Sequence, residues 1–285
     1  MSDNPQYGLP GAIALPRIRA LRLAGGDAVA FAQAQFMNDV AALEPGTWHW
    51  NGWLDPKGRV QALFALLRED ADRLLLVTPA DTDALAAALR RYVFRSKVSL
   101  ESVALHATGR LASPDQASGS RFARTDGGTI EIDLGGEAGA RTLLLDDAPS
   151  GQPTGAADAD AWWALDIAHG WPALPDARLD AFTPQQLSLQ RLAAFSVKKG
   201  CYPGQEIVAR THFLGRAKRG IARFSAPDAT PGASVQDAEG RDVGHVVCAA
   251  AGECLAVVPL DAAAGPFLSG GAPLSPLPLS DGLAR

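Results

Sequence analysis

The sequence predicts an α+β protein that ends in a small all-β module. In the first third of the chain, a segment with helical spacing of apolar residues precedes three strand-like runs, a second helix and a further strand. After residue 219, short apolar runs are separated by Gly, Pro and Asp. Because the strands come in blocks and do not alternate with helices one by one, an α+β fold is favoured over a doubly wound sheet.

The first third contains two expected helices and four expected strands. Residues 25–43 form the first helix, with Asp27 placed to favour its first turn. Asp81 caps an alanine- and leucine-rich helix that runs to about residue 95. The strands are expected at 48–54, 60–67, 74–77 and 98–105, and the turn-like DPKG and the polar REDAD separate the first three.

The rest of the chain is divided by two linker-like stretches, residues 112–128 and 148–160. Strands are expected between them, near 130–134 and 141–145. Helices at 161–168 and 185–194 bracket a proline-broken loop. The runs ARFSA, VGHVVCAA and CLAVVPL supply strands of the C-terminal module.

Composition and charge exclude several classes of protein. The net charge of -5 argues against a surface built as a whole to hold nucleic acid, although a local basic patch remains open. No run approaches the roughly 18 apolar residues of a membrane span, and the N-terminus lacks the pattern of a signal peptide. The cysteines Cys201, Cys248 and Cys254 and five scattered histidines have no metal-site spacing. A cytoplasmic protein without a metal site is expected.

The densest group of reactive side chains lies in VKKGCYPGQEIVARTHFLGRAKR, residues 197–219. Its basic residues favour the thiolate of Cys201 if the fold brings them near. Gly200 and Gly204 flank a tight turn in which the backbone can approach a ligand. The structural alternative is a small buried cysteine in a turn that enters a helix at Gly204 or Gln205. The basic side chains are Lys198, Lys199, Arg210, Arg216, Lys218 and Arg219.

KKGCYPGQE, residues 198–206, resembles the signature of the YgfZ family, which reads KGC, an aromatic, a variable residue and GQE. Three other segments resemble the family in the same order: GGDAVAFAQAQFMNDV, WLDPKGRVQALFALL and DAFTPQQLSLQRL. The resemblance covers roughly residues 12–260. It implies a fold similar to the aminomethyltransferase of the glycine cleavage system, with three domains around a central channel that holds tetrahydrofolate. The implied domains are 1–110 and 111–215, both α+β, the second with the motif at its end, and a β-barrel at 216–285.

The family implies a tetrahydrofolate-binding protein that supports assembly or repair of iron–sulfur enzymes, including radical enzymes that modify tRNA. Its partners would be folate and iron–sulfur client or assembly proteins. The resemblance assigns function to Cys201 and Lys199, and completes the motif with Gly200, Tyr202, Gly204, Gln205, Glu206 and Arg210.

Folate contacts are expected from six residues, each with a structural alternative. Asn38 and Asp39 lie toward the channel by resemblance, or form helix-end hydrogen bonds. Lys57 and Arg59 meet the folate tail or a partner, or belong to an exposed hairpin turn. Trp53 stacks on the pterin or belongs to the core, and Gln185 is a contact or an ordinary helix start.

Two other functions remain open. A one-carbon (aminomethyl) transferase is opposed by alignment, because the acidic pair of the transferase relative falls on Ala62 and Leu63, which cannot steer the folate amine. A tRNA-binding module would use the basic cluster, but the net charge argues against direct nucleic-acid binding.

Overall fold

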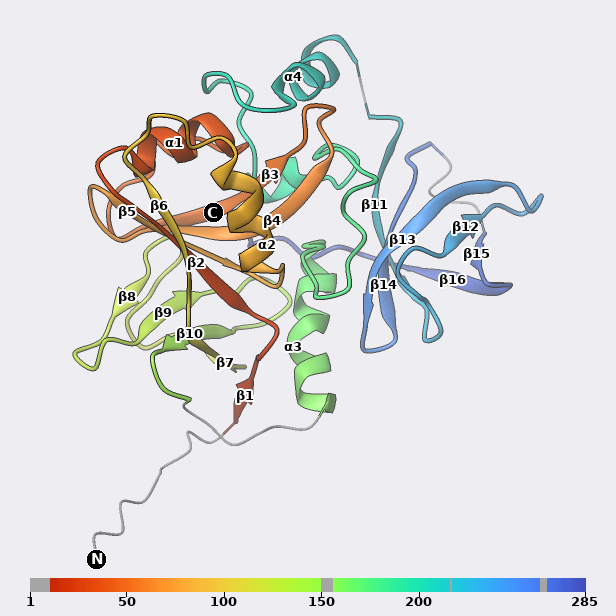
Figure 1. The fold of residues 1–285 in the computed structure, drawn as a ribbon. Coiled ribbons are helices and arrows are strands. Elements are labelled where there is room, and N and C mark those ends of the chain that lie inside the picture. The colour runs from red at the N-terminus through yellow and green to blue at the C-terminus, as the bar shows by residue number, and fades with distance from the viewer. Residues whose placement is uncertain (1–10, 150–155, 216, 262–265) are drawn as a thin grey trace, which may run out of the picture.

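Within the residues that the structure describes, the strands form two five-stranded sheets and a closed six-stranded barrel. The computed structural model describes residues 11–149, 156–215, 217–261 and 266–285. Figure 1 shows the two open sheets on one side of the molecule, the barrel on the other, and helix α3 (Ala156–His169) between them. The predicted α+β class with a terminal barrel is confirmed.

The first sheet is antiparallel throughout. Its leucines at positions 21, 23, 74 and 76 point to one face, as the two-residue period of strands requires, and pack there against helices α1 (Ala28–Gln35) and α2 (Thr82–Arg90). The carboxylate of Asp81 accepts from the backbone N–H groups of Asp83 and Ala84 and caps α2, as predicted. The strand order is β3 (Trp48–Leu54), β4 (Val60–Arg68), β5 (Arg73–Thr78), β2 (Arg19–Ala24) and β6 (Ser99–Val103).

The second sheet includes strands from both sides of the predicted boundary between residues 110 and 111. Its order is β1 (Ala12–Ala14), β7 (His106–Arg110), β10 (Thr142–Asp146), β9 (Ile130–Asp133) and β8 (Ala123–Arg124). A boundary at residues 104–105 would keep the strands of the two sheets apart in this part of the chain. Helix α3 packs closely on β7, because a Cβ atom at Gly109 would lie 2.5 Å from the ring of Trp162.

The barrel has its own core, built from side chains such as Phe224, Val246 and Phe267. Cys254 lies in this core, and Cys248 on the neighbouring strand faces the main core. The strand order is β11 (Arg219–Ser225), β14 (Glu253–Pro259), β13 (Asp242–Ala250), β12 (Ser234–Gln236), β15 (Phe267–Ser269) and β16 (Ala272–Leu277).

Two predicted helices are shorter than the sequence suggests. The helix predicted at 25–43 ends at Gln35, because Phe36 is extended and forms a β-bridge with Trp53. The helix predicted at 185–194 is a single 3-10 turn, η1 (Leu189–Leu192), because Ser188 and Ala193 at its ends adopt left-handed backbone conformations. Helix α4 (Gln205–Leu214), in the motif region, begins at Gln205, one of the two starts that the structural alternative allowed.

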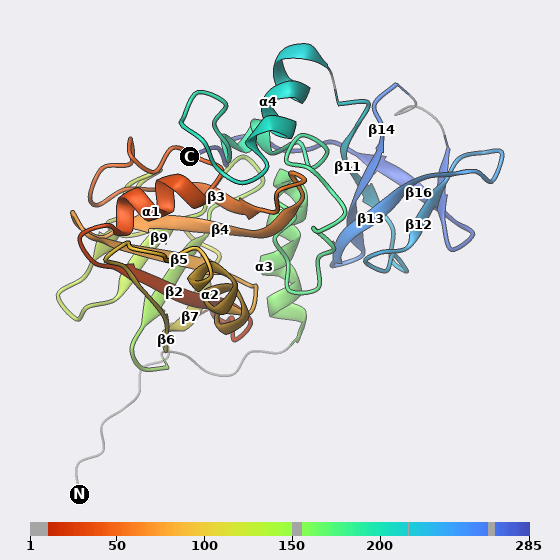
Figure 2. The same ribbon diagram turned by 45° about the horizontal axis from the view of Figure 1, so that its top comes forward.

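After the barrel the chain returns to the first sheet, where the C-terminus lies in Figure 2. The indole Nε1 of Trp50 donates to the carbonyl of Leu283 at 2.7 Å, and Arg191 pairs with Asp281 at 2.6 Å. The final segment therefore ties the barrel to the two open sheets.

Candidate functional site

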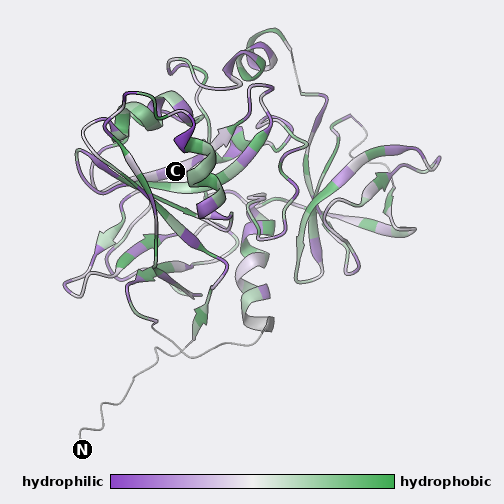
Figure 3. Cartoon of the chain, in the orientation of Figure 1, coloured by the Kyte–Doolittle hydropathy of each residue, from purple (hydrophilic) through white to green (hydrophobic). Residues whose placement is uncertain are grey.

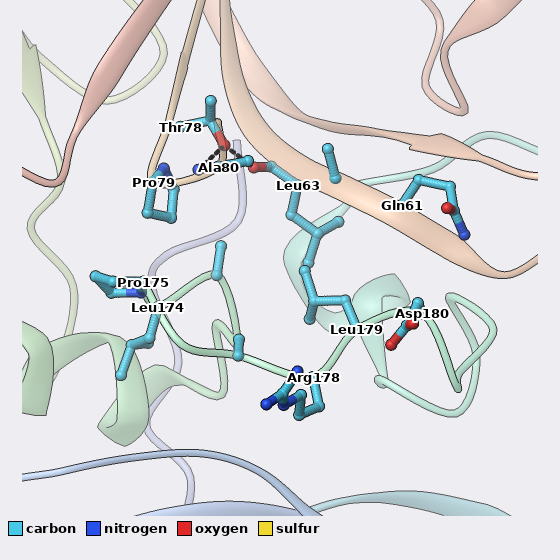
Figure 4. A pocket seen from close by; sticks show the side chains of 13 residues that line it. Gln61, Leu63, Thr78, Pro79, Ala80, Leu174, Pro175, Arg178, Leu179 and Asp180 are labelled. Carbon is cyan, nitrogen blue, oxygen red and sulfur yellow. Dashed lines mark hydrogen bonds between the residues drawn. The ribbon is translucent and has the colours of Figure 1, made fainter. Parts of the chain in front are cut away.

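A cavity of about 360 Å³ opens between β4, the end of β5 and the loop that follows α3 (Figure 4). Its volume lies in the range of roughly 300–1,000 Å³ that is typical of small-molecule sites. In Figure 4, Leu63 and Leu179 point toward each other across the cavity. The lining residues are Gln61, Ala62, Leu63, Thr78, Pro79, Ala80, Ala173, Leu174, Pro175, Ala177, Arg178, Leu179 and Asp180.

Polar side chains of this cavity lie at its rim. Gln61, Arg178 and Asp180 are exposed, and together they offer an amide, a guanidinium and a carboxylate. The hydroxyl of Thr78 is already committed, because it donates to the carbonyl of Leu63 at 2.8 Å and accepts from the N–H of Ala80. A ligand site needs a small number of placed polar groups, and these three side chains can supply them.

The two positions that align with the acidic pair of the transferase relative do line this cavity. Ala62 and Leu63 are 2% and 1% exposed, and their side chains point to opposite faces of β4, that of Ala62 toward the core beneath α1 and α2 and that of Leu63 toward the main core. Neither side chain can accept or donate a proton, so β4 supplies no acid–base function here.

A second, smaller cavity of about 40 Å³ shares Thr78, Pro79 and Ala173 with the first. Its lining includes Trp50 and Trp171, whose ring centroids lie 4.1 Å apart at an interplanar angle of 35°. The aromatic residue of β3 that reaches a cavity is therefore Trp50, and Trp53 lines neither of the two.

The cysteine motif lies outside both cavities. Cys201 is exposed in the loop before α4, and the nearby Lys199 and Tyr202 are buried. The ammonium group of Lys199 lies 4.8 Å from the ring centroid of Tyr202, a cation–π contact. Burial raises the pKa of Tyr202 to about 12, and its hydroxyl donates to the carbonyl of Ser196 at 3.2 Å.

Gly204 brings the motif against the turn of the β3–β4 hairpin. Its φ is +77°, and a Cβ atom there would lie 2.6 Å from the carbonyl oxygen of Asp55 and from Cα of Gly58. Only glycine fits this approach without strain. The side-chain amide of Gln205 donates to the carbonyl of Lys199 at 3.3 Å and closes the loop on itself. Glu206 and Arg210 are exposed on α4.

Asn38 and Asp39, predicted as folate contacts, lie in the segment that follows α1 and do not line the cavities described above. The side-chain amide of Asn38 donates to the carbonyls of Trp50 and Ala193 at 2.9 and 2.7 Å. The carboxylate of Asp39 accepts from Gln33 at 3.0 Å. Their contacts are those of the structural alternative, helix-end hydrogen bonding.

The other predicted folate contacts also lie outside the 360 Å³ cavity. Arg59 supports its wall, because its guanidinium donates to the carbonyl of Ala181 at 2.6 Å. Lys57 is exposed in the hairpin turn. Gln185 donates to the carbonyl of Val208 at 2.8 Å and holds α4 in place. Trp53 packs edge-on against Tyr92 at 6.2 Å.

The basic cluster is divided by the fold. Lys198, Arg210, Lys218 and Arg219 are exposed, whereas Lys199 is buried. Arg216 lies outside the described residues. Figure 3 shows hydrophilic and hydrophobic residues side by side on α4. Within the described ranges, no three His, Cys, Asp or Glu side chains come together as a metal site, and no helix is long and apolar enough to span a membrane.

Arg178 and Asp180 were not singled out from the sequence. They stand in a proline-flanked loop, where charged side chains are common and carry no periodic signal. Only the packing of this loop against β4 shows that they belong to a cavity.

Comparison with known proteins agrees with this architecture. Residues 218–280 match the family described as CAF17, C-terminal beta-barrel domain. The structure of glycine cleavage system aminomethyltransferase T from Bartonella henselae is similar with a TM-score of 0.72, covering 93% of this chain and 83% of that one at 16% identity. This likeness establishes the three-part fold.

Relatives in sequence cover most of the chain. An uncharacterized protein of Haemophilus influenzae is 29% identical over 218 residues, which cover 74% of this chain and 72% of that protein. The tRNA-modifying protein YgfZ of Edwardsiella ictaluri is 29% identical over 222 residues, 70% of this chain and 66% of its own length. YgfZ of Vibrio vulnificus YJ016 is 28% identical over 229 residues, with 74% and 68% covered. The chain is therefore similar in sequence to the YgfZ proteins, has the fold of the aminomethyltransferase, and ends in a barrel similar to the CAF17 C-terminal domain.

Proposed function

We propose that this chain binds tetrahydrofolate in the 360 Å³ cavity and supports iron–sulfur enzymes, including enzymes that modify tRNA, through the thiol of Cys201. The observation that carries the proposal is the separation of two features: a small-molecule cavity without the acidic pair, and an exposed thiol outside it. A protein that binds folate without transferring a one-carbon unit needs such a cavity. A protein that acts on a partner protein needs an accessible reactive group such as this thiol.

The cavity residues suit the chemistry of a reduced folate. The pterin carries a guanidine-like edge of N–H donors, which a carboxylate such as Asp180 can accept. The glutamate tail carries carboxylates, which the guanidinium of Arg178 can bind in a bidentate way. Leu63 and Leu179 offer apolar surface to the flat ring system. Bound folate would serve as a ligand whose one-carbon chemistry is the cofactor's own.

The thiol is presented for contact with a macromolecule. Cys201 is exposed, while Cys248 and Cys254 are buried and burial raises the pKa of Cys254 to about 12. Buried thiols of this kind are unreactive. A single cysteine cannot hold an iron–sulfur cluster, which usually takes about four thiolate ligands, so a partner would supply the rest. The name "tRNA-modifying protein" of the YgfZ relatives supports clients among tRNA-modifying enzymes.

Calorimetric titration with tetrahydrofolate tests the first half of the proposal. Wild-type protein and Cys201→Ala should bind with the same affinity, because the thiol is not part of the cavity. Ala80→Trp, which fills the cavity from a partly exposed position, should bind at least tenfold more weakly. No saturable binding by the wild-type protein would overturn the folate assignment.

Complementation tests the second half. In a strain without its own homologue, the wild-type chain should restore the activity of an iron–sulfur tRNA-modifying enzyme, and Cys201→Ala should not. Cys254→Ala is the matched control, because it removes a thiol that is buried in the barrel. Equal complementation by Cys201→Ala would remove the thiol from the proposal and leave the folate site untouched.

A further inference from the structure

Lys199 is the buried cation of the cysteine motif. The residue is 5% exposed. Its Nζ donates to the carbonyl oxygens of Gln33, Phe36 and Asn38, the last at 3.3 Å. An ammonium group has three N–H donors. All three are therefore engaged by backbone carbonyls within the fold.

Gln33 belongs to the last turn of α1, Phe36 is its C-cap residue, and Asn38 lies two positions beyond the C-cap. The last carbonyls of a helix have no partner inside it and carry the negative end of the helix dipole, so a cation there is stabilising. Helix α1 has no basic residue in its own last turn. Lys199 supplies that cation from 166 positions further along the chain.

The segment that follows α1 is itself held rigidly. The backbone N–H of Asn38 donates to the side-chain oxygen of Asn51 at 2.9 Å, and the N–H of Met37 donates to the carbonyl of Gly52 at 2.9 Å. The side-chain amide of Asn38 reaches Trp50 and Ala193. The segment after α1 that supplies two of the three carbonyl partners of Lys199 is thus anchored to strand β3.

The loop around Cys201 is attached to this segment on both sides of the thiol. Before Cys201, the N–H of Ser196 donates to the carbonyl of Met37 at 2.9 Å, and Lys199 follows with its three bonds. After Cys201, the buried ring of Tyr202 lies under the ammonium group of Lys199. Between them Gly200 and Cys201 are exposed.

We propose that Lys199 is a positioning residue, which caps the C-terminal end of α1 and thereby fixes the loop that presents Cys201, and that it exchanges no proton with the thiol. The inference rests on the proposed function only in treating Cys201 as the working group. Burial lowers the pKa of Lys199 to about 8, and the carboxylate of Asp39 opposes this effect. At neutral pH the group is therefore the ammonium ion that three carbonyls require.

Amide hydrogen exchange of residues 197–202 measures the attachment of the loop. Lys199→Met keeps the length of the side chain and removes its donors, so exchange should become at least about tenfold faster, which corresponds to about 1.4 kcal/mol. Lys198→Met is the matched control, because it removes the neighbouring but exposed ammonium group. Its exchange should stay within about twofold of the wild-type rate.

The pH profile of Cys201 alkylation measures proton exchange with the thiol. Intact-mass spectrometry with iodoacetamide reports on this thiol, because Cys248 and Cys254 are buried. Lys199→Arg keeps a cation and its donors but cannot give up its proton near neutral pH. The alkylation midpoint of Lys199→Arg should equal that of the wild type, and its loop exchange should stay closer to the wild type than that of Lys199→Met.

Unchanged exchange in Lys199→Met would overturn the proposal, and so would a shifted alkylation midpoint in Lys199→Arg with wild-type exchange. If Lys199→Met does not fold, the Arg variant still decides through its midpoint. Neither readout involves folate or an iron–sulfur protein. A failure of the proposed function would therefore leave this test intact.

Discussion

The stability of the protein should fall steeply in mild acid because of one buried histidine. His49 on β3 is 9% exposed, and burial lowers its pKa from 6.5 to about 4, with the ammonium of Lys199 adding to this effect and the carboxylate of Asp39 opposing it. The oxygen of the Asn51 amide accepts from the backbone N–H groups of Asn38 and Gly52, so its nitrogen must donate to Nε2 of His49 at 3.0 Å. Protonation would turn Nε2 into a donor that faces the amide N–H of Asn51, so the hydrogen bond between the two side chains would be lost.

The sign and size of the effect follow from linkage. The unfolded chain takes up a proton near pH 6.5, whereas the folded protein does so only near pH 4. The stabilising contribution of neutral His49 is therefore complete above pH 6.5 and is lost as the pH falls toward 4, by about 3 kcal/mol in total. Side-chain carboxyl groups ordinarily have pKa values near the lower end of this pH range, at about 4. A variant without the imidazole is therefore needed for comparison.

Urea unfolding of the wild type and of His49→Gln at several pH values between 7.5 and 4 isolates the contribution. Glutamine can still accept from Asn51 and has no charge in this range. The free energy of unfolding of the wild type should fall by about 3 kcal/mol more than that of the variant. An NMR titration should place the midpoint of His49 below pH 5. Parallel pH profiles, or a midpoint near 6.5, would refute the argument.

Three further predictions concern the cavity, the motif turn and the C-terminal segment. Arg178→Ala should weaken tetrahydrofolate binding about tenfold in calorimetry, because the guanidinium can bind the carboxylates of the glutamate tail. Binding of tetrahydropterin, which carries no carboxylate, should be unaffected, and equal losses would contradict the role of the guanidinium. Gly204→Ala should destabilise the protein by about 2 kcal/mol or more in thermal unfolding, because of its positive φ and the contact with Asp55. Gly200→Ala should be nearly neutral, because no atom lies within 4 Å of the new Cβ, and similar effects at both sites would show that the close approach does not matter. Trp50→Phe removes the buried hydrogen bond to the carbonyl of Leu283, so we expect the free energy of unfolding to fall by about 1–2 kcal/mol and carboxypeptidase to digest the C-terminus faster. Digestion at the wild-type rate would argue against a tethered C-terminal segment.

The larger elements of the fold could be predicted because their signals are local. The β3–β4 hairpin combines strand-like apolar runs with the turn DPKG, and α2 starts at a capping aspartate. The short strands β1, β8, β12 and β15, of three residues or fewer, give no periodic pattern of their own. The early end of α1 depends on the pairing of Phe36 with Trp53, which is a tertiary contact.

The candidate site shows the same division. The motif segment and the cavity positions Ala62 and Leu63 could be located from the sequence, because they follow short strings that resemble known relatives. The roles of individual side chains could not be predicted. Lys199 is a basic residue in a basic segment, and nothing local indicates that its ammonium group reaches α1, more than 160 positions away. Arg178 joins the cavity only because its loop packs on β4.

The hairpin of β3 and β4 connects the two features on which the proposed function depends. Its turn packs against Gly204 of the cysteine motif, and Arg59 at the end of that turn holds Ala181, beside the cavity residue Asp180. Two residues further along β4, Gln61 begins the stretch that forms the cavity wall. The thiol loop and the ligand cavity are therefore neighbours of one rigid element, although no lining residue of the cavity belongs to the motif. For this reason Gly204→Ala, which pushes the turn away from α4, acts on the contact that the two features share.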